Sequence, residues 1–239
     1  MKTTVSSHDT DNVIDLFTGK PFSSLEEARF VRLSPELDGL EMLYSNESST
    51  DKLFSLRILC WALQADGQVV GLVPWLDGVV ACQEIQDPLN GQFEGYYDPG
   101  IDELFFEAPI HKVVELESAA EYYEYQYNDP AEIVQEIPDF IGTHAVMTNT
   151  ETRTLTLQEV VSWRLHHDGV ILGMIVDENK VQSTPVLPGD ESLYACQSHD
   201  NFRYFFQYHI ANKIKSEDPE ALAAISVLVE DESGSALET

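Results

Sequence analysis

Carboxylates are the most abundant side chains capable of chemistry in this chain, and they are concentrated in its middle. The sequence has 42 Asp and Glu residues against 13 Lys and Arg, a formal net charge of −29 over 239 residues. Between Glu84 and Asp139, fifteen carboxylates accompany a single base, Lys112. Such a surface attracts basic proteins or cations and repels nucleic acid and anionic membranes. We therefore predict a basic protein partner, no direct nucleic-acid binding and no membrane association.

The carboxylates assigned to this acidic face lie in a loop and on a predicted helix. Along residues 111–127, acids follow one side of the helix with axial steps of about 6 and 4.5 Å. The mean charge density is about a third of that of duplex DNA, but the middle segment comes within about a factor of two. Local mimicry of nucleic acid toward a DNA-binding protein is therefore one form of the hypothesis. The predicted partner-binding residues are Asp98, Asp102, Glu103, Glu115, Glu117, Glu121 and Glu124.

No motif in the sequence identifies a reaction. Nucleotide-binding glycine patterns and the G-x-S-x-G nucleophile motif are missing. Cys60, Cys82 and Cys196 have no metal-ligand spacing, and the first two lie in apolar runs typical of buried, inert thiols. The His166-His167 pair is predicted to end a helix rather than to bind an ion. We expect a non-enzymatic protein without metal or cofactor; cation binding by the loop acids 98–103 is an alternative.

Two other classes of function compete with partner binding. An enzyme or small-molecule binder would need a pocket assembled from residues that are scattered along the chain. The candidates for lining such a pocket are Trp75, Tyr96, Tyr97, His111 and His144. A self-associating protein would instead use Phe202, Phe205 and Phe206 as an exposed patch, giving a homo-oligomer.

Composition and length bound the organisation of the chain. A chain of 239 residues, 43% of them hydrophobic, can bury a substantial core. It has no long apolar run and no apolar segment after Met1, so we expect neither a membrane span nor a secretory signal. An odd, low cysteine count indicates reduced thiols in the cytoplasm. We predict a flexible leader (1–27), a single globular domain (28–229) and an acidic tail (230–239).

The pattern of elements predicts an α+β fold with an antiparallel β-meander core and several short helices. Asp66-Gly67 and Asp77-Gly78 lie between apolar runs and indicate hairpin turns within residues 53–85. A second β-rich part is expected near 170–196. Pro74 and Gly71 predict an edge or irregular strand between the two turns. Helices are predicted near 111–127, 130–137, 157–166, 201–215 and 219–228.

One internal similarity indicates a repeat. The segment from Trp61 to Val73 resembles the segment from Trp163 to Ile175, and each is followed by Ala-Cys-Gln. Duplication of a β module explains this similarity, with sub-modules at 28–145 and 146–229. Convergence is the alternative, because Asp-Gly turns between buried segments share this pattern.

Overall fold

The structure is a computed structural model that describes residues 29–47, 53–87, 91–120, 132–149, 154–177 and 186–207. The predicted leader, the helix at 219–228 and the acidic tail lie outside these residues. The strands of the N-terminal half are β1 (Phe30–Pro35), β2 (Glu41–Ser45), β3 (Leu53–Arg57), β4 (Cys60–Gln64), β5 (Val69–Trp75), β6 (Gly78–Ala81), β7 (Gln86–Asp87), β8 (Gly91–Asp98) and β9 (Glu103–Phe105). Those of the C-terminal half are β10 (Ile133–Pro138), β11 (His144–Asn149), β12 (Thr154–Glu159), β13 (Ser162–His166), β14 (Ile171–Val176), β15 (Leu193–Ala195) and β16 (Phe202–Phe206).

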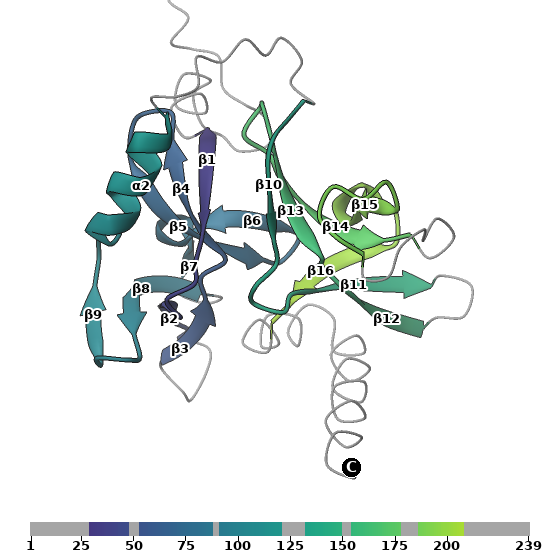
Figure 1. Cartoon of the computed structure of the whole chain (residues 1–239). Helices are drawn as coiled ribbons and strands as arrows, with labels where there is room; N and C mark the ends of the chain where they lie inside the picture. The colour runs from purple at the N-terminus through teal and green to yellow at the C-terminus, as the bar shows by residue number, and fades with distance from the viewer. Residues whose placement is uncertain are drawn as a thin grey trace, which may run out of the picture.

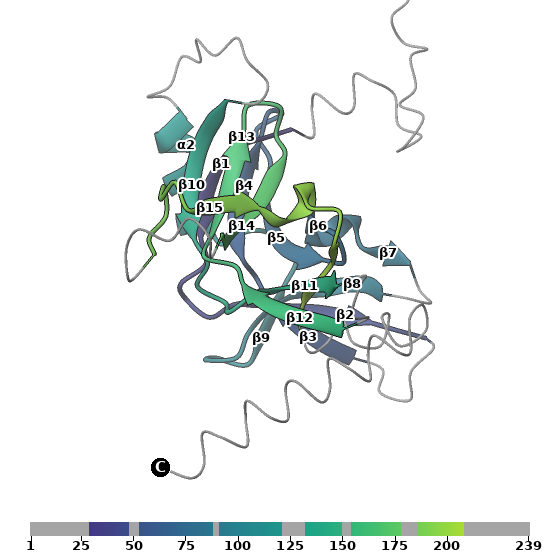
Figure 2. The same cartoon turned by 90° about the vertical axis from the view of Figure 1, so that its right-hand side faces the viewer.

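The predicted α+β class is wrong, because the described residues are mostly strand and include one α-helix, α2 (Ile110–Ala120). Two three-residue 3₁₀ helices, η1 (Cys82–Glu84) and η2 (Cys196–Ser198), are the other helical elements described. The strands form four small antiparallel sheets in a propeller-like ring. Figure 1 shows the N-terminal half on the left and the C-terminal half on the right. In Figure 2 the molecule is turned by 90°, so that the C-terminal half faces the viewer.

The two halves repeat one topology. In the N-terminal module (residues 30–98) one sheet has the order β1-β4-β5-β6, and the other places β2 between β3 and β8. In the C-terminal module (residues 133–206) the corresponding orders are β10-β13-β14-β15 and β12-β11-β16. The first strand of each module has a register shift at the same place, after Phe30 and after Ile133. The sequence similarity at Trp61 and Trp163 therefore marks equivalent positions of two modules that share one fold.

A hydrogen bond between a tryptophan indole and a carboxylate occurs at the same place in both modules, and we call this pair with its loop contacts the latch. Trp61 Nε1 donates to Glu36 Oε2 at 2.6 Å, and Trp163 Nε1 donates to Asp139 Oδ1 at 2.8 Å. The same carboxylates accept backbone N–H groups of the loop that follows them. Those donors are Asp38 and Leu40 for Glu36, and Gly142 and Thr143 for Asp139. One carboxylate thus holds both the loop to the second strand and the central tryptophan.

Each module needs a glycine in one strand, Gly71 in β5 and Gly173 in β14, because an aromatic ring packs directly against that position. A Cβ atom at Gly71 would lie 2.7 Å from Cε1 of Tyr96, and one at Gly173 would lie 2.9 Å from Cε1 of Phe205. The Tyr96 hydroxyl accepts a hydrogen bond from Gly71 N at 2.9 Å. Phe205 has no hydroxyl, and Gln197 Oε1 accepts from Gly173 N at 2.8 Å instead. Both modules satisfy the same buried N–H with different side chains.

The modules pack head to tail rather than symmetrically. The β1-β4-β5-β6 sheet contributes buried residues such as Leu33 and Leu72 to the core of the C-terminal module, where they pack in one cluster with Trp163 and Phe205. Strand β1 contacts β10 and β13 of the next module. Helix α2 contacts β1 and β4, which are the equivalents of those two strands. Leu116 of α2 joins the core around Trp61. The helix α2 therefore covers the N-terminal module in the same way that β1 covers the equivalent strands of the C-terminal module.

Both Asp-Gly turns and strands in both predicted β-rich parts are present, but residues 53–85 are not one meander. Strand β3 pairs with β2 in a separate sheet, and β4, β5 and β6 form the meander. Strand β5 is not an edge strand of its sheet, since it pairs with both β4 and β6, but Pro74 lies in its last part, which pairs with β6 alone. Strands β8 and β9 lie between the first predicted β-rich part and the predicted helix at 111–127. Helix α2 confirms the start of the helix predicted at 111–127; residues 121–127 lie outside the described ranges.

Three other predicted helices are wrong where the structure describes them. Residues 133–137 of the helix predicted at 130–137 belong to β10, and the helix predicted at 157–166 is the junction of β12 and β13. In apolar runs as short as these, the spacing of apolar residues alone does not distinguish a helix from a strand. In the helix predicted at 201–215, residues 202–206 form β16. A bulge opposite Val146 and Met147 brings Phe202 and Phe205 to one side, with ring centroids 5.0 Å apart, so a strand shows helical spacing there.

The latch makes a first prediction. Replacing the carboxylate by its amide, as Glu36→Gln or Asp139→Asn, removes a charged acceptor that receives three N–H groups. Each change should lower the free energy of unfolding by about 1–3 kcal/mol in urea titrations. The exposed Glu159→Gln is the matched control and should stay within about 0.5 kcal/mol. Equal stability of all three variants would show that the latch does not hold the fold.

The glycine–aromatic contact makes a second prediction. Tyr96→Phe and Gln197→Ala each leave the equivalent buried N–H, of Gly71 or Gly173, without its acceptor. Each variant should lose about 1–3 kcal/mol of unfolding free energy. Tyr97→Phe, which removes a hydroxyl from the exposed side of the same strand, is the control. If the Tyr96 and Tyr97 variants unfold at the same urea concentration, the role assigned to the Tyr96 hydroxyl is wrong.

Candidate functional site: an acidic groove beside helix α2

Residues 91–120, which belong to the acidic middle of the sequence, form one continuous stretch along the N-terminal module. Strand β8 turns back into β9, residues 106–110 cross to the helix, and α2 packs on β1. Asp98 ends β8 and pairs with Glu103 at the start of β9. Figure 1 shows β9 below α2 at the outer edge of this module. The hairpin and the helix therefore lie on the side of the N-terminal module that is away from the C-terminal module.

A groove of about 760 Å³ lies between this stretch and the loop after β1. Its lining combines carboxylates with an apolar floor. The residues are Asp38, Leu40, Asp98, Glu103, Phe105, Glu107, Ala108, Pro109, Ile110 and His111. Leu40 is buried at 4% exposure, whereas Glu103 and Glu107 are exposed. We call this feature the acidic groove.

The single base of the acidic middle is turned into the protein. Lys112 is 6% exposed, and its Nζ donates to Pro35 O at 2.9 Å and to Ser34 Oγ at 3.2 Å. Glu115 Oε2 lies 3.8 Å from the same Nζ. Lys112 therefore fixes α2 to β1 and contributes no cation to the lining of the groove.

Among the described residues that line the groove, His111 is the one with a basic side chain. Its Nε2 lies 3.1 Å from Asp38 Oδ2, and both side chains are more than half exposed. An exposed pair of this kind contributes little to stability. Asp38 is brought here by the latch loop, because its N–H donates to Glu36.

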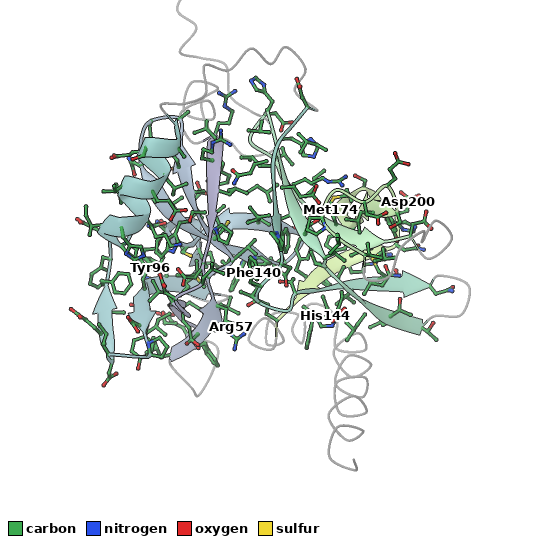
Figure 3. All side chains as sticks on the ribbon, viewed as in Figure 1. Arg57, Tyr96, Phe140, His144, Met174 and Asp200 are labelled. Atoms are coloured by element: carbon green, nitrogen blue, oxygen red, sulfur yellow. The ribbon has the colours of Figure 1, made fainter. Side chains whose placement is uncertain are left out.

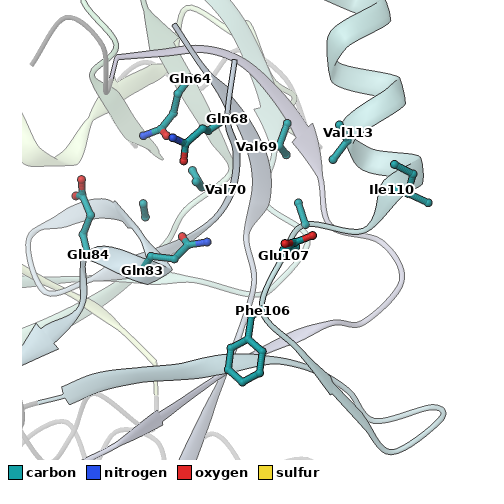
Figure 4. Close-up of a pocket in the computed structure, with 12 residues that line it drawn as sticks. Gln64, Gln68, Val69, Val70, Gln83, Glu84, Phe106, Glu107, Ile110 and Val113 are labelled. Atoms are coloured by element: carbon teal, nitrogen blue, oxygen red, sulfur yellow. The ribbon is translucent and has the colours of Figure 1, made fainter. Parts of the chain in front are cut away.

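A second hollow, of about 640 Å³, also borders residues 106–110 and is shown in Figure 4. Glu107, Ala108 and Ile110 line both hollows. The remaining lining is rich in amides and aliphatic side chains: Gln64, Gln68, Val69, Val70, Ala81, Gln83, Glu84, Phe106 and Val113. The segment 106–110 is thus a ridge between an acidic groove and an amide-lined hollow.

Large apolar side chains are exposed on and around the ridge. Phe106 is 65% exposed and Ile110 is 76% exposed. Val114 of α2, and Ile101 and Leu104 of the β8–β9 hairpin, are also exposed. Exposed apolar side chains bordered by polar residues mark surfaces that bind other proteins.

The predicted acidic-face residues divide by position. Asp98 and Glu103 line the acidic groove, and Asp102 lies in the adjoining turn, where it accepts a hydrogen bond from the Tyr97 hydroxyl at 2.8 Å. Glu115 and Glu117 lie on α2. Glu121 and Glu124 fall outside the described residues. Other acids of the middle segment are structural: Glu136 pairs with Arg164 at 3.0 Å, and Asp139 is a latch carboxylate.

The five residues proposed for a small-molecule pocket lie apart. Tyr96 is fully buried beside Trp61, and Trp75 packs edge-on against Tyr44. Tyr97 binds Asp102, which raises the pKa of the Tyr97 phenol. His111 lines the acidic groove, whereas His144 begins β11 in the other module. Figure 3 shows Tyr96 and His144 on different sides of the molecule.

Residues that sequence reasoning did not select complete the site. Asp38, Leu40 and Glu107 line the groove, and Lys112 holds the helix beneath it. Pro109 directly precedes the apolar residues with helical spacing, and a proline at this place indicates where α2 begins. No local pattern indicates that Asp38 lies near His111, because 73 positions separate them.

The structure gives no sign of thiol or metal chemistry in the residues it describes. Cys60, Cys82 and Cys196 are free and buried. Burial raises the pKa of all three thiols, that of Cys196 to about 12. Within the described ranges, no group of three or more His, Cys, Asp or Glu side chains is placed to hold a metal ion. The His166-His167 pair ends β13 and enters a turn, not a helix end as predicted.

No helix among the described residues has the length and apolar character to cross a membrane. Comparison with protein-family models, with curated proteins and with solved structures finds no match to this chain. The geometry of the site is therefore the basis for inferring function.

Thiol burial makes a third prediction. The native protein at pH 8 should react with a thiol reagent such as DTNB only on the timescale of unfolding, because all three thiols are buried and protonated there. In denaturant three thiols per chain should react at once. Rapid labelling of one thiol in the native protein would show that it is accessible and open the case for a reactive cysteine.

Proposed function

We propose that this chain is a non-enzymatic cytoplasmic protein that binds a basic partner protein through the surface formed by the β8–β9 hairpin, residues 106–110 and α2. The burial of Lys112 carries the proposal, because it removes the only base of this segment from the surface. The described lining of the groove then holds the carboxylates Asp98, Glu103 and Glu107 without a lysine or arginine.

The exposed apolar residues support binding to a protein rather than a role of the charge in solubility alone. Carboxylates keep a protein soluble wherever they lie on its surface. The exposed side chains of Phe106 and Ile110 lower solubility, because exposed apolar area promotes association with other molecules. Their position between two hollows supports a contact surface in which acids select a basic partner and apolar side chains supply contact area.

Salt-dependent capture makes a fourth prediction. The full chain, immobilised and exposed to cell extract, should retain a basic protein at low ionic strength and release it at high salt. The Debye length falls from about 10 Å at 0.1 M to about 3 Å at 1 M, which screens exposed carboxylates. Glu103→Gln combined with Glu107→Gln should reduce retention of that protein, measured by mass spectrometry of the eluate.

The matched control removes the same charge elsewhere. Glu159→Gln combined with Asp200→Asn changes two exposed acids of the C-terminal module. Retention by this variant should equal that of the unmodified chain. Equal loss in both double variants would indicate a general charge effect, and no loss in either would contradict the proposed site.

A further inference from the structure

We infer that the acidic groove takes a basic amphipathic segment of the partner, in which lysine or arginine side chains lie beside apolar ones. The inference rests on the proposed function and specifies the chemistry of the partner at that same site. A partner with a flat, purely cationic surface, such as one that recognises a nucleic-acid mimic, is the alternative that the experiment below distinguishes.

The floor and rim of the groove match the two parts of a long basic side chain. Leu40, Phe105 and Pro109 are apolar lining residues that are buried or half-buried, whereas the lining carboxylates of Glu103 and Glu107 are exposed. Lysine and arginine have an aliphatic stem and a charged end, and they bury the stem while the charge stays at the polar edge. A stem lying on this floor would place its cation among Asp98, Glu103 and Glu107. A purely acidic surface has no such floor.

Among the residues that the structure describes, no lysine or arginine places its cation in the groove. Lys112 points to Ser34 and Pro35, and its nearest carboxylate is Glu115, which does not line the groove. His111 lies against Asp38 at one edge. Asp98 accepts an N–H from Gly100, which is a local turn bond and brings no compensating charge. The groove is therefore complementary in charge to a basic ligand.

The ridge extends the contact to apolar side chains of the same segment. Phe106 and Ile110 are 65% and 76% exposed and stand between the groove and the amide-lined hollow. An apolar centre with a polar rim is the usual anatomy of a protein interface. Apolar neighbours of the bound lysine or arginine would cover these two side chains.

Two synthetic peptides of equal length and charge test the inference on the full chain. One is an amphipathic Lys/Leu peptide and the other a Lys/Ser peptide, each carrying a fluorophore for anisotropy titration at low and high salt. The Lys/Leu peptide should bind about tenfold or more tightly than the Lys/Ser peptide. In Phe106→Ser combined with Ile110→Ser, the two affinities should become equal while the Lys/Ser affinity is unchanged.

Control variants separate the groove from general effects. Phe140→Ser removes a side chain that is 52% exposed in the other module, labelled in Figure 3, and should preserve the preference for the Lys/Leu peptide. Ile110→Ser alone changes the more exposed ridge residue. It keeps the test valid if the double variant fails to fold, as judged by circular dichroism.

The outcomes distinguish this inference from the proposed function. Equal binding of both peptides by the unmodified chain overturns the amphipathic partner but keeps an acidic surface that binds basic proteins. A preference that survives the ridge variants also overturns it, because the apolar contact would then lie elsewhere. If neither peptide binds and the pull-down retains no basic protein, the proposed function itself is lost.

Discussion

The hydrogen bond between the carboxylate that follows the first strand and the indole of a central tryptophan is the interaction on which each module depends. Glu36 and Asp139 each stand directly after the first strand and accept an indole N–H and two loop N–H groups. Glu36 is buried and Asp139 is half-buried, and withdrawing a carboxylate from water is costly unless its acceptor sites are filled. Satisfying it fixes both the loop to the second strand and the tryptophan around which that module's core packs. In the N-terminal module the same loop places Asp38 at the groove.

Head-to-tail packing explains why the acidic surface lies on only one side. The C-terminal module closes its core with the sheet of its neighbour, and the N-terminal module, first in the order, closes its core with α2. A helix used as a cap is buried on one side only. Leu116 and Lys112 occupy the inner side of α2, and the outer side with the adjoining ridge is left for acids and exposed apolar residues. The cap thereby provides the surface that we propose as the binding site.

Turn chemistry was the part of the fold most readable from residues alone. Asp66-Gly67 gives a hairpin because Gly67 adopts a φ of +88°, and Gly169 repeats it at +88°. Helix prediction failed where strands break or bulge. At residues 160–161 one strand ends and the next begins within two residues, so the apolar spacing of the pair resembles a helical period. The bulge in β16 produces the same effect at Phe202 and Phe205. Both are properties of strand pairing, which local spacing does not contain.

The sequence by itself determined the acid excess, its concentration between residues 84 and 139, the hairpin turns and the repeated Trp and Asp-Gly positions, because each depends on residue identity or near neighbours. Tertiary structure decided which carboxylates are structural and which are exposed. Glu136 and Asp139 belong to the same acidic run as Glu103 and Glu107, yet partners brought from distant strands bind the first pair. It also decided that Lys112 is buried, since its acceptors on Ser34 and Pro35 lie far away in sequence. Burial depends on what packs against a side chain, and in this protein that is set by segments tens of residues apart.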